Sequence, residues 1–306
     1  MSWFPVPETI PSKVFTPLPD RFRAAKRTLW ADFNKGGAEV DSFLEGPAFD
    51  RAGNLYVTDI PNGRIFRIDR AGGWEHVATY DGWPNGLKIA ADGRILITDY
   101  KRGLVVLDPG SGSVTPHYTY IRSESFKGVN DLVISGSGDI FFTDQGQTGM
   151  QDPSGRVYRL TVDGRLERLL DTCPSPNGIA LDPTEGWIYV ALTRACQIWR
   201  MPVTRDSVTG KVNVFAHMPG GMSGPDGLAV DEEGGLAVAN PGHGCIWLLD
   251  RHGVPRFRVE SCGGRTITNV AYDPKDLHRL VFTDSDLGQV LEARVPIRGL
   301  LLASHG

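Results

Sequence analysis

The amino-acid sequence predicts an all-β chain folded as a six-bladed β-propeller. One observation is a short segment that recurs six times along the 306 residues and begins at a carboxylate or carboxamide side chain. The other is an alternating apolar run after each copy. We call the first side chain of each copy a slot residue; the slot residues are Glu45, Asn85, Asn130, Asn177, Asp226 and Asn269. They lie 40 to 49 residues apart, a period that fits one four-stranded blade per copy.

Each copy also supplies the later strands of its blade. Second strands such as residues 53–59 are rich in β-branched and aromatic residues, and third strands such as residues 64–69 follow them. Aspartates that close the second strands are interpreted as turn caps; they are Asp59, Asp99, Asp144 and Asp284. Short outer strands are expected at residues 75–80, 114–119, 166–171, 212–216 and 256–260.

The last copy has no outer strand after it, and the N-terminal segment is expected to provide one. Residues 26–34 precede the first slot residue, so we expect them to form the outer strand of blade six and to close the ring. Blade starts near the six slot residues leave no room for a domain boundary. The whole chain, residues 1–306, is therefore interpreted as a single propeller domain.

Composition argues against several classes of function. The formal net charge is −4, and basic and acidic residues are interleaved, so we expect no nucleic-acid partner. No apolar run approaches the roughly 20 residues of a membrane helix, and the N-terminus lacks the regions of a signal peptide. We therefore expect a cytoplasmic protein without membrane association. The four cysteines show no metal-binding spacing and are expected to be reduced.

The slot residues predict a metal site. The innermost strand of each blade runs beside the central channel, so all the slot side chains should open onto one end of that channel as a ring of oxygens. Glu45 and Asp226 would repel each other there unless a cation lay between them. Such a ring suits Ca²⁺, which takes about 6–8 oxygen ligands. Mg²⁺, Mn²⁺ and Zn²⁺ remain alternatives, although Zn²⁺ usually requires nitrogen or sulfur ligands.

The alternative is that the slot residues only form turns. Asn and Asp before Gly are common turn formers whose side chains bond their own backbone. Glu is a poor turn residue, and Glu45 fills the same position, which favours the metal site.

Four segments resemble the SMP-30/gluconolactonase/LRE family. They are Glu45-Gly46-Pro47, Val129-Asn130-Asp131-Leu132, Ser175-Pro176-Asn177-Gly178 and Gly224-Pro225-Asp226-Gly227. The resemblance implies a six-bladed propeller whose divalent ion, usually calcium, is held by Glu45, Asn177 and Asp226. It places Asn130 at the substrate or in the metal shell. Members are mostly lactone hydrolases, so a small lactone is the expected partner, and the sequence leaves a homodimer open.

One position departs from the family pattern. Members similar to the animal protein carry an Arg two residues before the blade-three Asn, and Gly128 stands there in this chain. Arg122 and Lys127 lie in the same loop and are candidates to replace that cation. The resemblance to bacterial members with broader lactone specificity is closer.

Asp226 is the candidate catalytic base. A metal ion would polarise the lactone carbonyl and stabilise the oxyanion that forms when water adds. One oxygen of Asp226 could bind the ion while the other takes a proton from the attacking water. A serine nucleophile is not expected, because no Gly-x-Ser-x-Gly segment has a suitable strand-to-helix setting.

Further residues are candidates for substrate binding. Trp83 precedes a slot residue, and His243 lies in a loop expected near Asp226; the full set is Asn85, Asn130, Asn269, His243, Trp83, Arg122 and Lys127. Residues 145–154 form a long glycine-containing loop that is expected to act as a lid. Two other functions remain open: a non-catalytic binding propeller stabilised by metal, and a calcium-dependent hydrolase of aryl esters or phosphotriesters.

Overall fold

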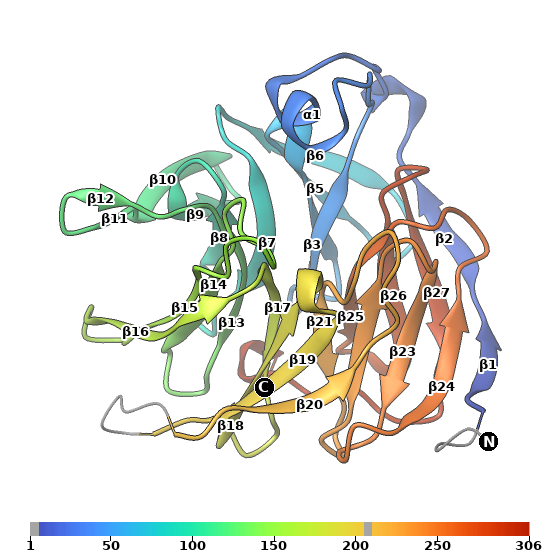
Figure 1. The fold of residues 1–306 in the computed structure, drawn as a ribbon. Coiled ribbons are helices and arrows are strands. Elements are labelled where there is room, and N and C mark those ends of the chain that lie inside the picture. The colour runs from blue at the N-terminus through green and yellow to red at the C-terminus, as the bar shows by residue number, and fades with distance from the viewer. Residues whose placement is uncertain (1–5, 205–209, 306) are drawn as a thin grey trace.

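Six sheets surround a central channel in the computed structural model (Figure 1), which describes residues 6–204 and 210–305. Within each sheet the strands that follow one another in the chain pair antiparallel. Blades one, two and three are β3 (Leu44–Phe49), β4 (Leu55–Asp59), β5 (Arg64–Ile68), β6 (Trp74–Thr79); β7 (Pro84–Ile89), β8 (Ile95–Asp99), β9 (Gly103–Asp108), β10 (Ser113–Tyr118); and β13 (Val129–Ile134), β14 (Ile140–Asp144), β15 (Gly155–Leu160), β16 (Leu166–Cys173). The predicted propeller is confirmed.

The remaining blades complete the ring. Blades four, five and six are β17 (Pro176–Leu181), β18 (Trp187–Leu192), β19 (Gln197–Pro202), β20 (Asn213–His217); β21 (Leu228–Val230), β22 (Leu236–Asn240), β23 (Cys245–Leu249), β24 (Pro255–Glu260); and β25 (Ile267–Asp273), β26 (Asp276–Asp284), β27 (Gln289–Arg294). A small hairpin of β11 (Tyr120–Ile121) and β12 (Glu124–Ser125) projects between blades two and three.

The N-terminal segment closes the ring, as expected, but with different residues. The outer strand of blade six is β2 (Lys13–Pro17), which pairs antiparallel with β27 and is reinforced by a Lys13 Nζ–Glu292 Oε1 ion pair of 2.9 Å. The preceding strand β1 (Glu8–Pro11) pairs parallel with β24 and adds a fifth strand to blade five. Figure 1 shows both blue strands beside the orange strands of the C-terminal blades. Two blade edges are thereby covered.

The prediction that residues 26–34 form this outer strand is wrong. Leu29–Asn34 form the helix α1, whose first turn is capped because Thr28 Oγ1 accepts a hydrogen bond from the Ala31 N–H. Trp30 is buried against Phe43, with ring centroids 4.9 Å apart. A short apolar run can be helix or strand, and here the cap and the packing of Trp30 decide for a helix.

The pairing register of the first strands shifts next to the slot residues. Five of the six first strands have a bulge at this point; the shifts fall within the intervals 45–48, 84–87, 129–132, 176–179 and 267–270. A bulge re-aims the side chains beside it. The blades are also very close here: a Cβ atom at Gly178 would lie 2.2 Å from the carbonyl oxygen of Asp226. Only glycine fits at that approach.

In residues 6–204 and 210–305, no helix is long and apolar enough to cross a membrane. All four cysteines are free thiols.

Candidate metal centre

The slot residues gather where the first strands enter the channel. Glu45, Asn130, Asn177 and Asn269 are buried, while Asn85 and Asp226 are half-buried. They come from six different blades, so the ring closure described above is what brings them together.

Burial raises the pKa of Glu45 to about 7. Hydrogen bonds from the Gly46 N–H, 2.8 Å away, and from Asn269 Nδ2, 2.9 Å away, oppose this shift. The negative charge of Asp131 adds to it. Even with two donors, Glu45 is therefore hard to ionise in this position without a cation.

The pKa of Asp226 is shifted in the same direction. Burial raises the pKa of Asp226 well above its ordinary value, and the charges of Glu45 and Asp131 raise it further. The amide of Asn177 and the positive charge of Arg194 act in the opposite direction. The negative charges of Glu45 and Asp131 thus both act on Asp226, and a divalent cation bound beside these groups would relieve that repulsion.

Two carboxamides are oriented so that their oxygens remain available. Asn130 Nδ2 donates to Gln145 Oε1 at 2.8 Å, and Gln145 Nε2 in turn donates to Ser175 Oγ at 2.9 Å. Asn177 Nδ2 donates to Thr193 Oγ1 at 3.2 Å. With each amide nitrogen held in this way, the amide oxygen can serve as a ligand for a hard cation.

Asn269 is used differently from these two residues. Its Oδ1 accepts from the Val270 N–H at 2.8 Å, and its Nδ2 donates to Glu45 Oε2. Both ends of this carboxamide are occupied within the protein, as the turn interpretation predicts for a slot residue. Asn269 therefore positions Glu45 and is a poor candidate for contact with substrate.

The candidate metal ligands are therefore a mixture of carboxylate and carboxamide side chains. In the part of the chain that the structure describes, no group of three or more His, Cys, Asp and Glu side chains is arranged to hold a metal ion. A centre here depends on amide oxygens beside the carboxylates, and all of these donors are oxygens. The residues fit a calcium ion better than a zinc ion.

A belt of hydroxyl groups, which sequence reasoning missed, fixes the backbone of the ring. Threonines near the ends of the second strands donate to the carbonyl of the slot residue in the next blade, or of the residue before it. The bonds run from Thr58 to Asn85, Thr98 to Asn130, Thr143 to Asn177 and Thr193 to Pro225, and Ser285 bonds Leu44 across the closure. The Thr-Asp pair that recurs at the ends of the second strands is the sequence pattern that could have indicated these bonds. Five of the six blades thus hold the backbone at, or just before, the slot residue of the next blade.

Two of the aspartates that close the second strands cap the turn after them, as predicted: Asp99 accepts from the Lys101 and Arg102 N–H groups, and Asp284 accepts from the Asp286 and Leu287 N–H groups. The other two bond a more distant part of the chain. Asp59 Oδ1 accepts from the Phe43 N–H at 2.8 Å, and Asp144 Oδ1 accepts from the Gly128 N–H at the same distance. Both bonds hold the chain two residues before a slot residue.

Aromatic residues line the slot end of blades one and two. Trp83 lies 5.8 Å from the ring of Tyr100 and 6.4 Å from Phe33 of α1, measured between ring centroids. Lys101 Nζ lies 4.9 Å from the Trp83 ring. Helix α1, which lies where a strand was expected, therefore contributes to the wall beside the ring of slot residues.

Tyr100 also accounts for the glycine at position 128, where some members of the family have an Arg. A Cβ atom at Gly128 would lie 2.5 Å from the Tyr100 ring, and the φ angle of Gly128 is +150°. An Arg at this position, as in the animal members, would collide with that ring. Tyr100 therefore fills the space beside Gly128.

The two cations predicted to compensate are placed differently. Lys127 is exposed and its Nζ donates to Ser154 Oγ, at the end of the 145–154 loop, at 2.9 Å. Arg122 lies in the β11–β12 hairpin and lines another cavity with Tyr158 and Arg168. The structure does not bring Arg122 to the ring.

His243 is tied to the loop that leads to Asp226. Its Nε2 lies 2.5 Å from the Gly220 carbonyl oxygen, so this nitrogen carries the proton and donates it. The contact anchors the 218–225 loop.

Phe126, which precedes Asn130, packs in the core against Phe142 and Tyr158.

Two charged residues at the ring were not recognised in the sequence. Asp131 is buried, its Oδ1 lies 3.9 Å from Lys88 Nζ, and blade three is the one blade with an acid directly after the slot residue. Arg194 follows the Thr193 of the belt and acts on Asp226 through its charge. A comparison of the repeats position by position would have found Asp131.

Comparisons with known proteins agree with this architecture. The SMP-30/gluconolactonase/LRE-like region matches residues 43–286. Lactonase drp35 of Staphylococcus aureus (strain MRSA252) is 28% identical over 239 residues, covering 74% of this chain and 71% of that protein. Diisopropyl-fluorophosphatase of Loligo vulgaris is 27% identical over 259 residues, covering 76% of this chain and 82% of that protein.

Among solved structures, the calcium-binding protein regucalcin from Agrobacterium tumefaciens strain C58 has a TM-score of 0.77 at 23% identity, covering 97% of this chain and 98% of that one. The gluconolactonase XC5397 of Xanthomonas campestris has a TM-score of 0.74 at 23% identity, covering 94% and 99%. These structures share the propeller fold. Because the family match spans most of the chain and includes every slot residue, this protein belongs to the SMP-30/gluconolactonase/LRE-like family.

Proposed function

We propose that this protein is a metal-dependent lactone hydrolase and that its ion is calcium. The observation that carries the proposal is the set of three acids, Glu45, Asp131 and Asp226, which repel one another at the slot end of the channel. The names of relatives that are lactonases or calcium-binding proteins support it.

Glu45, Asn130, Asn177 and Asp226 are the proposed ligands. Each has a side-chain oxygen, and the amide nitrogens of both carboxamides are engaged in hydrogen bonds within the protein. A bound divalent ion would supply Lewis-acid polarisation of the lactone carbonyl.

The chain itself would supply the proton transfer and the binding surface. Asp226 is the ligand that is least enclosed, because Glu45, Asn130 and Asn177 are buried and Asp226 is half-buried. We propose that Asp226 takes the proton from the attacking water. Arg194 favours the ionised form of Asp226 that this role requires.

The aromatic wall suggests the class of lactone. The rings of Trp83 and Tyr100 lie 5.8 Å apart between centroids, and Tyr100 fills the space beside Gly128, where the Arg is missing. This surface suits a lactone with an apolar substituent better than a polyhydroxylated sugar lactone.

Hydrolysis of a lactone panel, varied in ring size and in side-chain polarity, tests the proposal. Turnover should disappear with a chelator and return with calcium. Asp226→Asn should reduce kcat by at least about 100-fold, while exposed Glu39→Gln, the matched control, should leave it unchanged. A protein that binds calcium yet hydrolyses none of these lactones would be the non-catalytic binding propeller instead.

Hydrolysis of phosphotriesters or aryl esters is the second candidate activity. The similarity to the diisopropyl-fluorophosphatase of Loligo vulgaris favours it. Rates on a lactone, an aryl ester and a phosphofluoridate, compared under one condition, would rank the two activities.

A further inference from the structure

A second cavity lies at the end of the channel away from the slot residues. The slot residues stand near the beginning of the first strands, whereas this cavity is lined by residues at the ends of those strands, among them Phe49, Ile89, Ile134 and Leu181. Its volume is about 580 Å³, within the range of about 300–1,000 Å³ that is usual for small-molecule sites.

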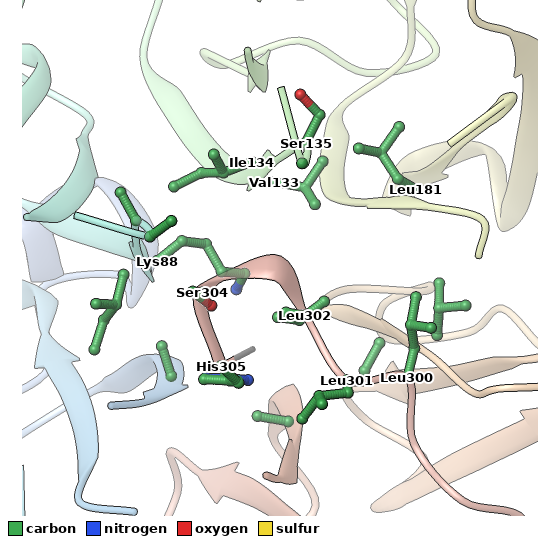
Figure 2. A pocket seen from close by; sticks show the side chains of 18 of the residues that line it. Lys88, Val133, Ile134, Ser135, Leu181, Leu300, Leu301, Leu302, Ser304 and His305 are labelled. Carbon is green, nitrogen blue, oxygen red and sulfur yellow. The ribbon is translucent and has the colours of Figure 1, made fainter. Parts of the chain in front are cut away.

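The walls of this cavity are mostly hydrocarbon. Figure 2 shows Val133, Ile134 and Leu181 on one side and Leu301 and Leu302 on the other. The two leucines remain 47% and 37% exposed in the protein. Apolar side chains held open around a cavity gain free energy when an apolar ligand covers them.

The C-terminal segment forms one wall and is firmly attached. The Leu300 N–H donates to the Val230 carbonyl at 3.0 Å, and the Gly299 N–H donates to the Leu277 carbonyl at 2.8 Å. Beyond the leucines, Arg51 Nε donates to the Ser304 carbonyl at 3.0 Å. These bonds tie blades five, six and one together, so the cavity is a built part of the fold.

Most charged groups at the rim are already engaged. Asp92 pairs with Arg94 at 2.7 Å, Asp182 accepts from Thr184 Oγ1 at 2.6 Å, and Glu185 accepts from the Gly136 N–H at 2.6 Å. Asp92 and Asp182 are held within their own turns, and Glu185 is held by a turn of the neighbouring blade.

Lys88 is the exception. Its side chain is 16% exposed, and in Figure 2 it reaches towards the middle of the cavity. Its nearest charged partner is Asp131 Oδ1 at 3.9 Å, beyond hydrogen-bond distance, and no acceptor among the described residues forms a hydrogen bond with its ammonium group. A partly buried ammonium with three donors gains from an anionic acceptor.

We propose that this cavity binds an aliphatic carboxylate, with the carboxylate on Lys88 and the hydrocarbon chain between Ile134, Leu181 and Leu302. The apolar walls supply affinity, and the single cation selects for an anion. The cavity opens at the other end of the channel from the proposed hydrolytic centre, and Lys88 adjoins that centre through Asp131. The inference does not depend on the proposed hydrolytic function.

Calorimetric titration with octanoate tests the proposal. A chelator is present throughout, so that a metal at the ring cannot take the carboxylate. We expect saturable binding of one octanoate per chain. Octan-1-ol, which has the same chain length without the charge, should bind about tenfold more weakly, and butyrate should bind more weakly still.

Three variants locate the binding site. Lys88→Met should weaken octanoate binding about tenfold without changing octanol binding. Ile134→Trp should abolish binding by filling the cavity, and exposed Lys275→Met, a control near the same end, should leave it unchanged. Thermal unfolding checks each variant; if Lys88→Met does not fold, Ile134→Trp and the octanol comparison decide. Absence of saturable binding, equal affinity for octanoate and octanol, or full binding by Ile134→Trp would each overturn the proposal.

Discussion

Removal of the metal should make the stability of this protein depend on pH through Glu45. The pKa of Glu45 is raised to about 7 in the folded protein, from an ordinary value of 4.5, mainly because the carboxyl group is buried. Between these two values the folded chain binds more protons than the unfolded chain. The stabilising contribution is therefore complete below about pH 4.5 and is lost as the pH rises through about 7.

The shift corresponds to a loss on the order of 3 kcal/mol in the free energy of unfolding. Asp226 acts in the same direction, since its pKa is also raised. A bound calcium ion should remove the effect, because it stabilises the ionised carboxylates of the folded state.

Denaturant unfolding of chelator-treated protein between about pH 5 and about pH 8 measures this effect. The wild-type protein should lose stability over this range relative to Glu45→Gln, whose side chain cannot ionise. Exposed Glu39→Gln should follow the wild-type curve. If the wild-type and Glu45→Gln curves run parallel across the range, Glu45 is not a buried acid with a raised pKa, and the ring holds no charge repulsion for a cation to relieve.

Three further outcomes follow from the structure. Thr143→Val removes a hydroxyl donor of the belt, so it should lower the free energy of unfolding by about 1–3 kcal/mol and weaken calcium binding. The control, exposed Thr172→Val, should change the free energy of unfolding by less than about 0.5 kcal/mol. Denaturant unfolding and calcium titration of both variants measure these effects. Deletion of residues 1–17 removes β1 and β2 and should leave an aggregating protein, so a monodisperse, cooperatively unfolding product in gel filtration and calorimetry would contradict the closure argument. Gly128→Ala should destabilise the protein by on the order of 2 kcal/mol through contact with Tyr100, and Tyr100→Ala should rescue part of that loss in a double-mutant cycle.

Much of the fold was predictable because the chain repeats itself. The spacing of Glu45, Asn85 and the later slot residues predicted six blades, and the second, third and outer strands lie close to the expected ranges. Ring closure by the N-terminal segment was predicted too, while its residues were not. The apolar run around Trp30 fits either a helix or a strand, and the cap at Thr28, with packing on Phe43, decides between them.

The proposed metal centre was likewise predictable only in part. The sequence alone determined which oxygen-bearing side chains begin the blades, because each blade repeats the same local pairing. Only the tertiary structure showed that Asn269 is hydrogen-bonded to Glu45, that Asp131 adds a third acidic charge, and that Tyr100 fills the space beside Gly128. These contacts join residues from different blades at positions that do not repeat, so they exist only once the ring is closed.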